Sequence, residues 1–281
     1  MLNRKLPGTL IGIAAALVWL ELYPKAVNAQ ESDRERAGIY VGAFITNRNT
    51  DARVDSSSGG SGSNVDLEND LGLESSTSVG RFSGYVWLSK RQRIDASYFD
   101  LSRPASRKID KTINWGDQTF NINTVLSTEN HLTITKVDYT FSFLNKDKGW
   151  LGINGGLYVM NTSFSLSEPS LGKFETSSLT APLPVLGLRG EYAFAEHWNL
   201  RGATQWFGIT TNDVSGHLTD TYAGVDYGFG KHNRMFVGLA YDTVKLRIDT
   251  KKTNLSGSLD WGYDGWLAYF KMDFGGGVAN R

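Results

Sequence analysis

Four short polar turns, each next to aromatic residues, constrain the fold of this chain more than any other feature. The turns lie at 89–92, 145–149, 196–197 and 231–234. The aromatic residues at their edges are Trp87, Phe143, Trp150, Phe194, Trp198, Phe229 and Phe236. The other ends of the same apolar segments run into much longer polar connections. Short turns at one end, long loops at the other and a ring of aromatic residues are typical of a transmembrane β-barrel.

The start of the chain has the layout of an export signal. Arg4 and Lys5 give a positive start, residues 10–20 are apolar, and small residues at 27–29 precede a cleavage site. We therefore predict a secretory signal peptide at 1–29, because the apolar run is too short for a stable membrane helix. Its removal takes three basic residues and one acidic residue from the 29 of each sign, which leaves a net charge of −2. With no basic excess, we expect no nucleic-acid partner.

Apolar and polar residues alternate with a period of two after about residue 37, as Val137, Tyr139 and Phe141 do with their polar neighbours. The mature chain has no cysteine and no apolar stretch of membrane-helix length. If the chain spans a membrane, it must do so as a closed barrel, because only closure pairs the backbone N–H and C=O groups of every strand on both sides. Four short turns joining five hairpins predict an all-β fold: a transmembrane antiparallel up-and-down β-barrel of about ten strands over 30–274. Eight or twelve strands are the alternatives, and 275–281 form a short C-terminal tail.

Two long connections differ in character. Residues 47–77 include a run at 56–63 that is entirely Ser or Gly, which needs no fixed structure. Residues 108–130 keep some alternation around Gly116, and we expect them to form a hairpin that continues past the membrane into water. Both connections belong to the end of the barrel that carries the long extracellular loops.

A soluble barrel with an apolar core and a charged exterior is the main rival, because alternation alone does not say which face is inside. Three observations favour the membrane barrel. The loops at the two ends are strongly unequal in length, aromatic residues gather next to the short turns, and the chain nearly ends on an alternating strand whose last aromatic residue is Phe274.

The final strand, with Trp266, Phe270 and Phe274 on one face, resembles those of small bacterial outer-membrane β-barrel proteins of the OmpA-like and OmpW-like kind. The resemblance covers the whole mature chain and rests on pattern, not on a unique motif. It implies a monomer in the bacterial outer membrane, surrounded by outer-membrane lipid and lipopolysaccharide, and insertion by the barrel-assembly machinery. In that group the aromatic residue is usually the last one, whereas here the tail at 275–281 follows.

If the apolar faces point to lipid, the opposite faces line the inside of the barrel, its lumen. Six basic and six acidic residues fall on those faces, and in a narrow lumen they should pair, since an unpaired buried charge costs several kcal/mol. A barrel of about ten strands has little spare width, so we expect a packed polar lumen, with a narrow channel as the alternative. The expected network is Arg81, Arg93, Asp95, Lys136, Asp138, Arg189, Glu191, Arg201, Asp226, Asp242, Lys271 and Asp273.

The acidic stretch at 65–74 could bind a divalent cation through carboxylate oxygens, including a cation shared with lipopolysaccharide phosphates. It lacks the spacing of an EF-hand loop. A short amphipathic turn that folds its leucines onto the rim is the favoured interpretation, so we predict no metal site.

We also consider a catalytic role, because some outer-membrane β-barrels are enzymes. Protease barrels of the omptin kind, which resemble this chain in expected strand number, use paired aspartates and an Asp/His pair at the outer rim. Here Asp213, His217 and Asp220 lie near one loop, but no facing Asp-x-Asp pair is evident. Lipid A deacylases use a His/Ser arrangement, and here Thr133 stands near His131 where a serine would be expected. With no nucleophile–base pair visible, we predict no catalytic residue and no cofactor.

The sequence therefore predicts a non-enzymatic outer-membrane barrel with a structural or surface-interaction role and a plugged polar lumen. A narrow channel for small solutes is the first alternative. A hydrolase at the outer rim is the second.

Overall fold

The computed structural model describes residues 35–230, 234–252 and 255–275. The predicted signal peptide at 1–29 and the tail beyond 275 lie outside these residues. No helix in the described ranges is long and apolar enough to cross a membrane. The strands in these ranges are β1 (Ala37–Val54), β2 (Val65–Asp66), β3 (Ser76–Trp87), β4 (Gln92–Lys108), β5 (Ile113–Trp115), β6 (Gln118–Phe120), β7 (Val125–Lys146), β8 (Gly149–Glu168), β9 (Lys173–Ala195), β10 (Trp198–Thr210), β11 (Val214–Phe229), β12 (Met235–Lys252) and β13 (Leu255–Phe274).

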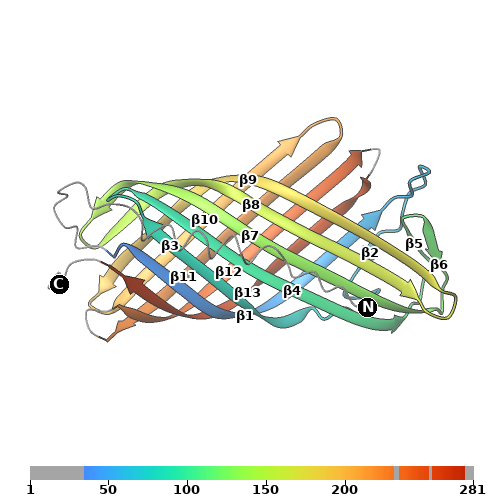
Figure 1. Ribbon diagram of the computed structural model, residues 1–281, viewed down its shortest axis with the longest axis horizontal. Coiled ribbons are helices and arrows are strands. Elements are labelled where there is room, and N and C mark those ends of the chain that lie inside the picture. The colour runs from blue at the N-terminus through green and yellow to red at the C-terminus, as the bar shows by residue number, and fades with distance from the viewer. Residues whose placement is uncertain (1–34, 231–233, 253–254, 276–281) are drawn as a thin grey trace, which may run out of the picture. The chain divides into compact units, whose positions relative to one another are not determined.

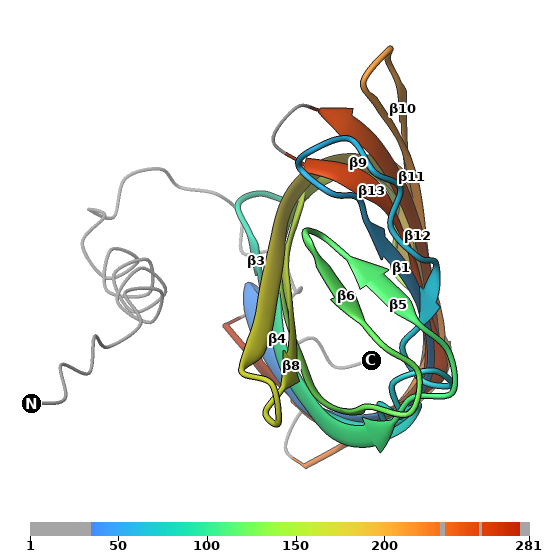
Figure 2. The same ribbon diagram turned by 90° about the vertical axis from the view of Figure 1, so that its right-hand side faces the viewer.

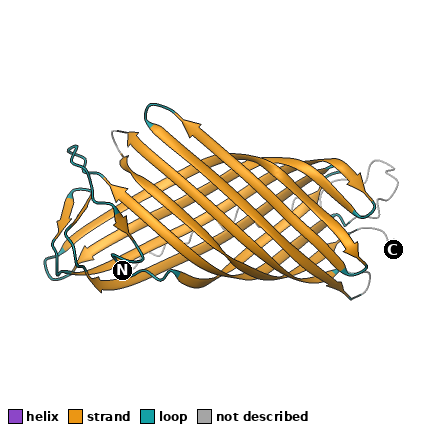
Figure 3. Ribbon diagram, turned by 180° about the vertical axis from the view of Figure 1, so that it is seen from behind, coloured by secondary structure: helices purple, strands orange, loops and turns teal. Residues whose placement is uncertain are grey.

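Ten long strands form one closed antiparallel ring (Figure 1 and Figure 3). They pair in the order β1, β3, β4, β7, β8, β9, β10, β11, β12, β13. The ring closes because β13 pairs with β1 along the whole length of β1, from Ala37 opposite Phe274 to Val54 opposite Gly257. Closure leaves no long strand with a free edge, as a strand in hydrocarbon requires. The prediction of an up-and-down barrel with ten strands is confirmed.

Side chains on the ring alternate between an apolar exterior and an interior that holds the charges. Val41, Leu186 and Trp266 point outward and are 57%, 73% and 54% exposed, whereas Arg93 and Asp138 point inward and are 3% and 1% exposed. Bulky apolar side chains open to the surroundings around buried charges are the reverse of a water-soluble barrel. The exterior therefore suits lipid, and the soluble alternative does not fit.

Glycine allows close approach where inward side chains are large. A Cβ atom on Gly156 of β8 would lie 2.3 Å from both Asp138 Oδ1 and the Val137 carbonyl oxygen on β7. Such an atom would overlap both groups. The glycine thus leaves room for the Asp138 carboxylate on the inner surface of the wall.

The short turns of neighbouring hairpins are tied together at one end of the barrel. Asn145 Nδ2 donates a hydrogen bond to the Lys90 carbonyl oxygen at 2.6 Å, and Ala193 N donates to the Lys148 carbonyl oxygen, also at 2.6 Å. Next to these turns, on the outer surface, the Trp198 ring contacts the Tyr227 ring edge-on, with centroids 5.1 Å apart. Short linked turns beneath exposed aromatic rings match the sequence prediction for this end.

The opposite end differs from the sequence prediction, because the hairpin expected at 108–130 folds into the barrel mouth instead of continuing into water, and part of the preceding long connection folds in with it. Figure 2 shows β5 and β6 lying across the opening. Trp115 and Phe120 of this hairpin are fully buried, as are Val65 and Leu67 of the preceding connection. We call residues 55–75 and 109–124 together the plug.

The plug forms for a physical reason that the loop sequences do not reveal by themselves. Its apolar side chains pack against inward apolar residues in the loop-side half of the barrel, including Leu132, Met160 and Leu246. Burying such side chains in this wide mouth is more favourable than leaving them in water. The expected amphipathic turn at 65–74 agrees with the burial of Leu67 and Leu71.

The Ser/Gly run is also ordered in part. Ser56 Oγ and Ser57 N donate hydrogen bonds to Asp117 Oδ1 at 2.7 and 2.9 Å, and Ser57 Oγ donates to Oδ2 at 2.8 Å. These bonds from Ser56 and Ser57 hold the pKa of the exposed Asp117 carboxyl below its usual value. The two parts of the plug are therefore joined to each other above the mouth.

Candidate functional site: the barrel lumen

The lumen has two chemically distinct layers. The turn-side layer holds the charged residues that the sequence analysis assigned to the lumen. The loop-side layer is mainly apolar and is filled by the plug, which the sequence analysis did not predict. The apolar wall residues of the loop-side layer include Phe44, Leu132, Ile134, Tyr158, Met160, Leu183, Val185, Leu218, Val244, Leu246 and Trp261.

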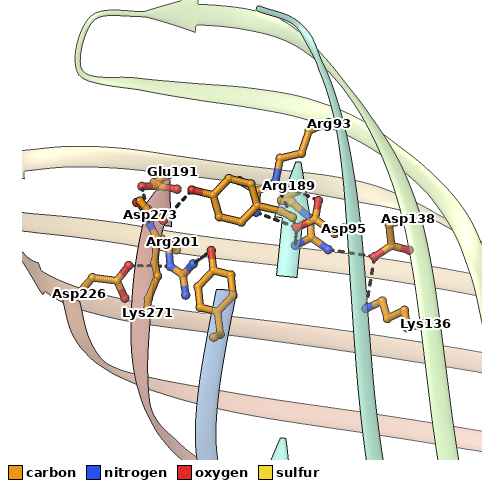
Figure 4. Close-up of polar contacts among 12 residues, drawn as sticks. Arg93, Asp95, Lys136, Asp138, Arg189, Glu191, Arg201, Asp226, Lys271 and Asp273 are labelled. Carbon is orange, nitrogen blue, oxygen red and sulfur yellow. Dashed lines mark hydrogen bonds and ion pairs between the residues drawn. The ribbon is translucent and has the colours of Figure 1, made fainter. Parts of the chain in front are cut away.

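The centre of the charged layer is a chain of ion pairs around Arg189 (Figure 4). Arg189 Nη1 lies 3.2 Å from Asp95 Oδ1, and its Nη2 lies 3.0 Å from Asp138 Oδ2. Asp95 also pairs with Arg93 at 2.7 Å, so one carboxylate accepts from two guanidinium groups. Since these residues come from β4, β7 and β9, the ion pairs connect walls that are distant in sequence.

Lys136 extends this chain to another wall. Its Nζ lies 2.8 Å from Asp220 Oδ2 on β11 and 3.8 Å from Asp138 Oδ2. Asp138 also accepts a hydrogen bond from Gln205 Nε2 at 2.9 Å. Asp220 and Gln205 are buried partners that were absent from the network assigned from sequence.

A second group is organised by tyrosines. Arg201 pairs with Asp226 at 2.9 Å and donates to the hydroxyls of Tyr40 at 2.5 Å and Tyr269 at 2.8 Å. Tyr269 in turn donates a hydrogen bond to Asp226. The predicted network did not include these tyrosines because it was assembled from charged residues alone, although Tyr40 and Tyr269 lie on the inward face of their strands.

The remaining predicted network residues form two further groups. Lys271 Nζ lies 2.9 Å from Asp273 and 4.0 Å from Glu191, and Asp273 accepts a hydrogen bond from the Tyr85 hydroxyl at 2.8 Å. Arg81 pairs with Asp242 at 2.5 Å. The structure thus brings all twelve residues to the inner surface, and each has an opposite charge within 4.0 Å.

Little space is left between these side chains. The cavity among them has a volume of about 80 Å³ and is lined by residues such as Arg81, Asp95, Lys136 and Tyr222. That is room for a few water molecules, because a water needs only a small cavity with polar partners. The layer therefore forms an ionic floor beneath the apolar plug, with little space left between its side chains.

One polar cluster attaches the plug to the wall. Arg103 Nη1 lies 2.5 Å from Glu68 Oε1 of the plug, and Glu68 Oε2 accepts a hydrogen bond from Thr50 N at 2.8 Å. Arg103 also donates to Thr50 Oγ1 and Asn130 Oδ1 at 3.1 and 3.0 Å. This attachment could not be predicted from the sequence, because Glu68 lies in a loop and Arg103 lies on a strand 35 positions away.

The residues weighed for catalysis do not form a site. His217 points outward from β11, whereas Asp220 on the same strand is 5% exposed and pairs with Lys136. The His131 ring also points outward, with Nδ1 3.8 Å from Asp100 Oδ1. His217 and Asp220 therefore lie on opposite faces of the strand, and they cannot act together as the residues of a rim hydrolase.

Metal ligation has equally little support in the described ranges, where no group of three or more His, Cys, Asp or Glu side chains is arranged to hold a metal ion. In the acidic stretch, Glu68 is engaged by Arg103, and Asp70 lies 2.5 Å from Lys111. Its carboxylates thus serve the packing of the plug.

Comparison with solved structures identifies the fold. The chain is similar to the outer membrane protease OmpT from Escherichia coli, with a TM-score of 0.57 and 14% identity over 88% of this chain and 99% of that one. Lower scores relate it to the toluene transporter TodX of Pseudomonas putida (TM-score 0.37, 10% identity, 86% and 91% covered) and to Ail, the attachment invasion locus protein of Yersinia pestis (0.36, 10%, 84% and 99%). No protein-family model matches. No curated protein matches either.

The fold is that of a bacterial outer-membrane β-barrel. The exposed apolar exterior around a charged interior agrees with residence in the outer membrane. At 14% identity, the similarity to OmpT concerns the fold and not the activity.

Proposed function

We propose that this protein is a monomeric, non-enzymatic outer-membrane barrel whose lumen is closed and whose role is exerted at its loop-side surface. The observation that carries the proposal is the double closure of the lumen. The ionic floor joins strands that are not neighbours in the ring through Arg189 and Lys136, and the apolar plug above it is fixed through Glu68.

The long strands support a role outside the membrane. A transmembrane β-strand needs about 9–11 residues, whereas β7 has 22 and β9 has 23. Since the turns at the other end are short, the excess length projects from the loop side. It carries a mainly polar outer surface there, as at Asp100, His131 and Asn161. Such a projecting rim is suited to contacts with lipopolysaccharide or with external molecules.

We also propose that this barrel is related to the OmpA-like and OmpW-like barrels. This relation is supported by the up-and-down order of the strands and by the outward Trp266, Phe270 and Phe274 of the last strand. The same strand supports the proposal that the barrel-assembly machinery inserts this protein.

Single-channel recording tests the closed lumen. We expect no conductance steps from the wild-type protein in planar bilayers. Replacing residues 111–122 with a short Gly-Ser linker should remove the hairpin but leave the ionic floor, so this variant should also stay silent. Combining that replacement with Arg189→Ala should produce steps, because both closures are then weakened.

Two results would contradict the proposal. Steady conductance in the wild type that changes with Arg189→Ala would identify the narrow channel instead. Conductance after removal of the hairpin alone would mean that the ionic floor does not close the lumen.

A further inference from the structure

Two neighbouring short turns carry a cluster of exposed cations that no part of the lumen uses. Lys90 and Arg91 lie in the turn between β3 and β4, Lys146 is the last residue of β7, and Lys148 lies in the turn between β7 and β8. The turns are joined by the hydrogen bond from Asn145 to the Lys90 carbonyl and by one from Ser142 N to the Arg91 carbonyl at 2.7 Å. The four cations therefore share one edge of the barrel.

These cations have few anions near them in the chain. In the part of the chain that the structure describes, none of the four forms an ion pair or a side-chain hydrogen bond, and the two turns contain a single carboxylate, Asp147. The next turn along the barrel edge, at 195–198, has no Lys or Arg and carries Glu196. These two turns are therefore more positive than the turn at 195–198, although the sequence of the fourth short turn also contains Lys231 and Arg234.

An apolar groove begins at this cluster and runs across the outer surface. It has a volume of about 510 Å³ and includes Lys146 and Lys148 in its lining. Outward Leu144, Tyr192 and Leu200 form its sides and are 44%, 52% and 48% exposed. The groove therefore lies on the lipid-facing surface and meets the cations at the membrane edge.

The floor of the groove is low because small residues face outward in one cross-strand row. Gly190 of β9 pairs with Gly202 of β10, which pairs with Ala223 of β11. The adjacent row has the bulky Tyr192 and Leu200 at the corresponding positions. A hollow with small residues along its floor and large side chains on its sides can receive an extended hydrocarbon chain.

We propose that this groove binds one anionic glycerophospholipid of the leaflet at the turn side. An acyl chain occupies the hollow over Gly190 and Gly202, and the head-group phosphate contacts Lys146 and Lys148. Lys90 and Arg91 add to the positive potential beside it. The proposal rests on the membrane placement argued above and adds a preferred lipid charge at a defined sector.

Charge complementarity distinguishes this occupant from ordinary surrounding lipid. Any lipid can fill an apolar hollow, but only a head group with net negative charge gains from four nearby cations. A basic residue close to an anionic lipid surface contributes about 1 kcal/mol, which is about fivefold in affinity. Two lysines at the groove thus correspond to roughly a 25-fold preference that their removal should abolish.

Native mass spectrometry of the full chain released from detergent micelles tests the proposal. The micelles contain either phosphatidylglycerol or phosphatidylcholine, and the fraction of barrel carrying one lipid is measured for each. We expect the wild type to retain phosphatidylglycerol preferentially. The variant Lys146→Gln/Lys148→Gln should lose this preference, while Lys245→Gln/Lys251→Gln, with the same charge change at the loop side, should keep it.

A second variant tests the hollow without touching the charges. A Cβ atom on Gly202 would meet only the Tyr222 carbonyl oxygen, at 3.4 Å, so Gly202→Leu can enter the hollow without a backbone collision. It should lower retention of both lipids. Folding of each variant is checked by its gel migration with and without heating.

Failure of the lipid site and failure of the membrane placement give different results. Equal retention of the two lipids by the wild type, or an unchanged preference in Lys146→Gln/Lys148→Gln, would overturn the lipid site. A wild-type protein that is soluble and monomeric without detergent and retains neither lipid would instead overturn the membrane placement.

Discussion

Replacing Arg189 with methionine would remove the side chain that joins two carboxylates in the lumen. Asp95 and Asp138 are 8% and 1% exposed and lie 3.2 and 3.0 Å from the guanidinium group. Removing one partner of a buried ion pair typically costs 3–5 kcal/mol, because the remaining charge stays buried without compensation. Here Asp95 keeps Arg93 at 2.7 Å, and Asp138 keeps Gln205 at 2.9 Å and Lys136 at 3.8 Å. The expected loss in the free energy of unfolding is therefore near the lower limit, about 3 kcal/mol.

Urea-induced unfolding in lipid vesicles, followed by tryptophan fluorescence, measures this loss. The control is Arg91→Met, which removes the same type of side chain from an exposed turn and should change stability by less than about 0.5 kcal/mol. The double variant Arg189→Met/Asp138→Asn should recover at least about 1 kcal/mol relative to Arg189→Met, because it also removes the carboxylate that loses its partner. Equal unfolding free energies for Arg189→Met and Arg91→Met would refute the view that the ionic floor stabilises the barrel.

Three further perturbations test other parts of the structure. Val225→Arg places a cation on the lipid-facing side of β11 and should lower the folding yield in vesicles, at a cost of about 2–4 kcal/mol near the midplane; an unchanged yield would mean that this face does not contact lipid. Gly156→Ala should destabilise the barrel by about 1–3 kcal/mol through overpacking, whereas Gly208→Ala, where a Cβ atom would meet nothing within 4 Å, should not. The Asp117 carboxyl has a lowered pKa in the folded state, so its bonds to the Ser/Gly run are fully present above the ordinary aspartate pKa of about 4 and are lost as the pH falls through the lowered value. Backbone hydrogen exchange at 56–58 should accordingly show less protection in strong acid than at neutral pH, after correction for intrinsic rates; equal protection would contradict a role for this carboxylate.

The strand number and the two faces of the barrel could be predicted because they depend on local pattern. The alternation around Val137 places its apolar side chains outward in the structure, and the short turns fix which ends are joined. The same pattern placed Arg93, Asp138 and Lys271 inside. It could not identify their partners, because Asp95 and Arg189 are 94 positions apart and meet only when the ring closes.

The inward fold of the plug could not be predicted from the sequence, whereas the place of the tyrosines could have been. The amphipathic turn expected at 65–74 places Leu67 on the rim, and the connection with Trp115 keeps some alternation, but neither pattern shows whether a loop turns into the barrel or into water. The burial of Leu67 and Trp115 depends on the width of the mouth and on the apolar wall there, which are properties of the assembled ring. Tyr40 and Tyr269 could have been assigned to the lumen, because each alternates with outward apolar residues on its own strand. An aromatic residue thus has to be assigned by its face as well as by its type.

Spin-label accessibility at two adjacent positions tests the inside-out arrangement most directly, and the absence of native cysteine makes it simple to apply. Leu239 on β12 is 46% exposed and points outward, whereas Ala240 is 2% exposed and points inward. In lipid vesicles, a label on Leu239→Cys should collide frequently with dissolved oxygen, which concentrates in hydrocarbon, and a label on Ala240→Cys should not. The opposite order, or frequent collision of the Leu239→Cys label with a water-soluble nickel complex, would contradict the assignment of the apolar face to lipid.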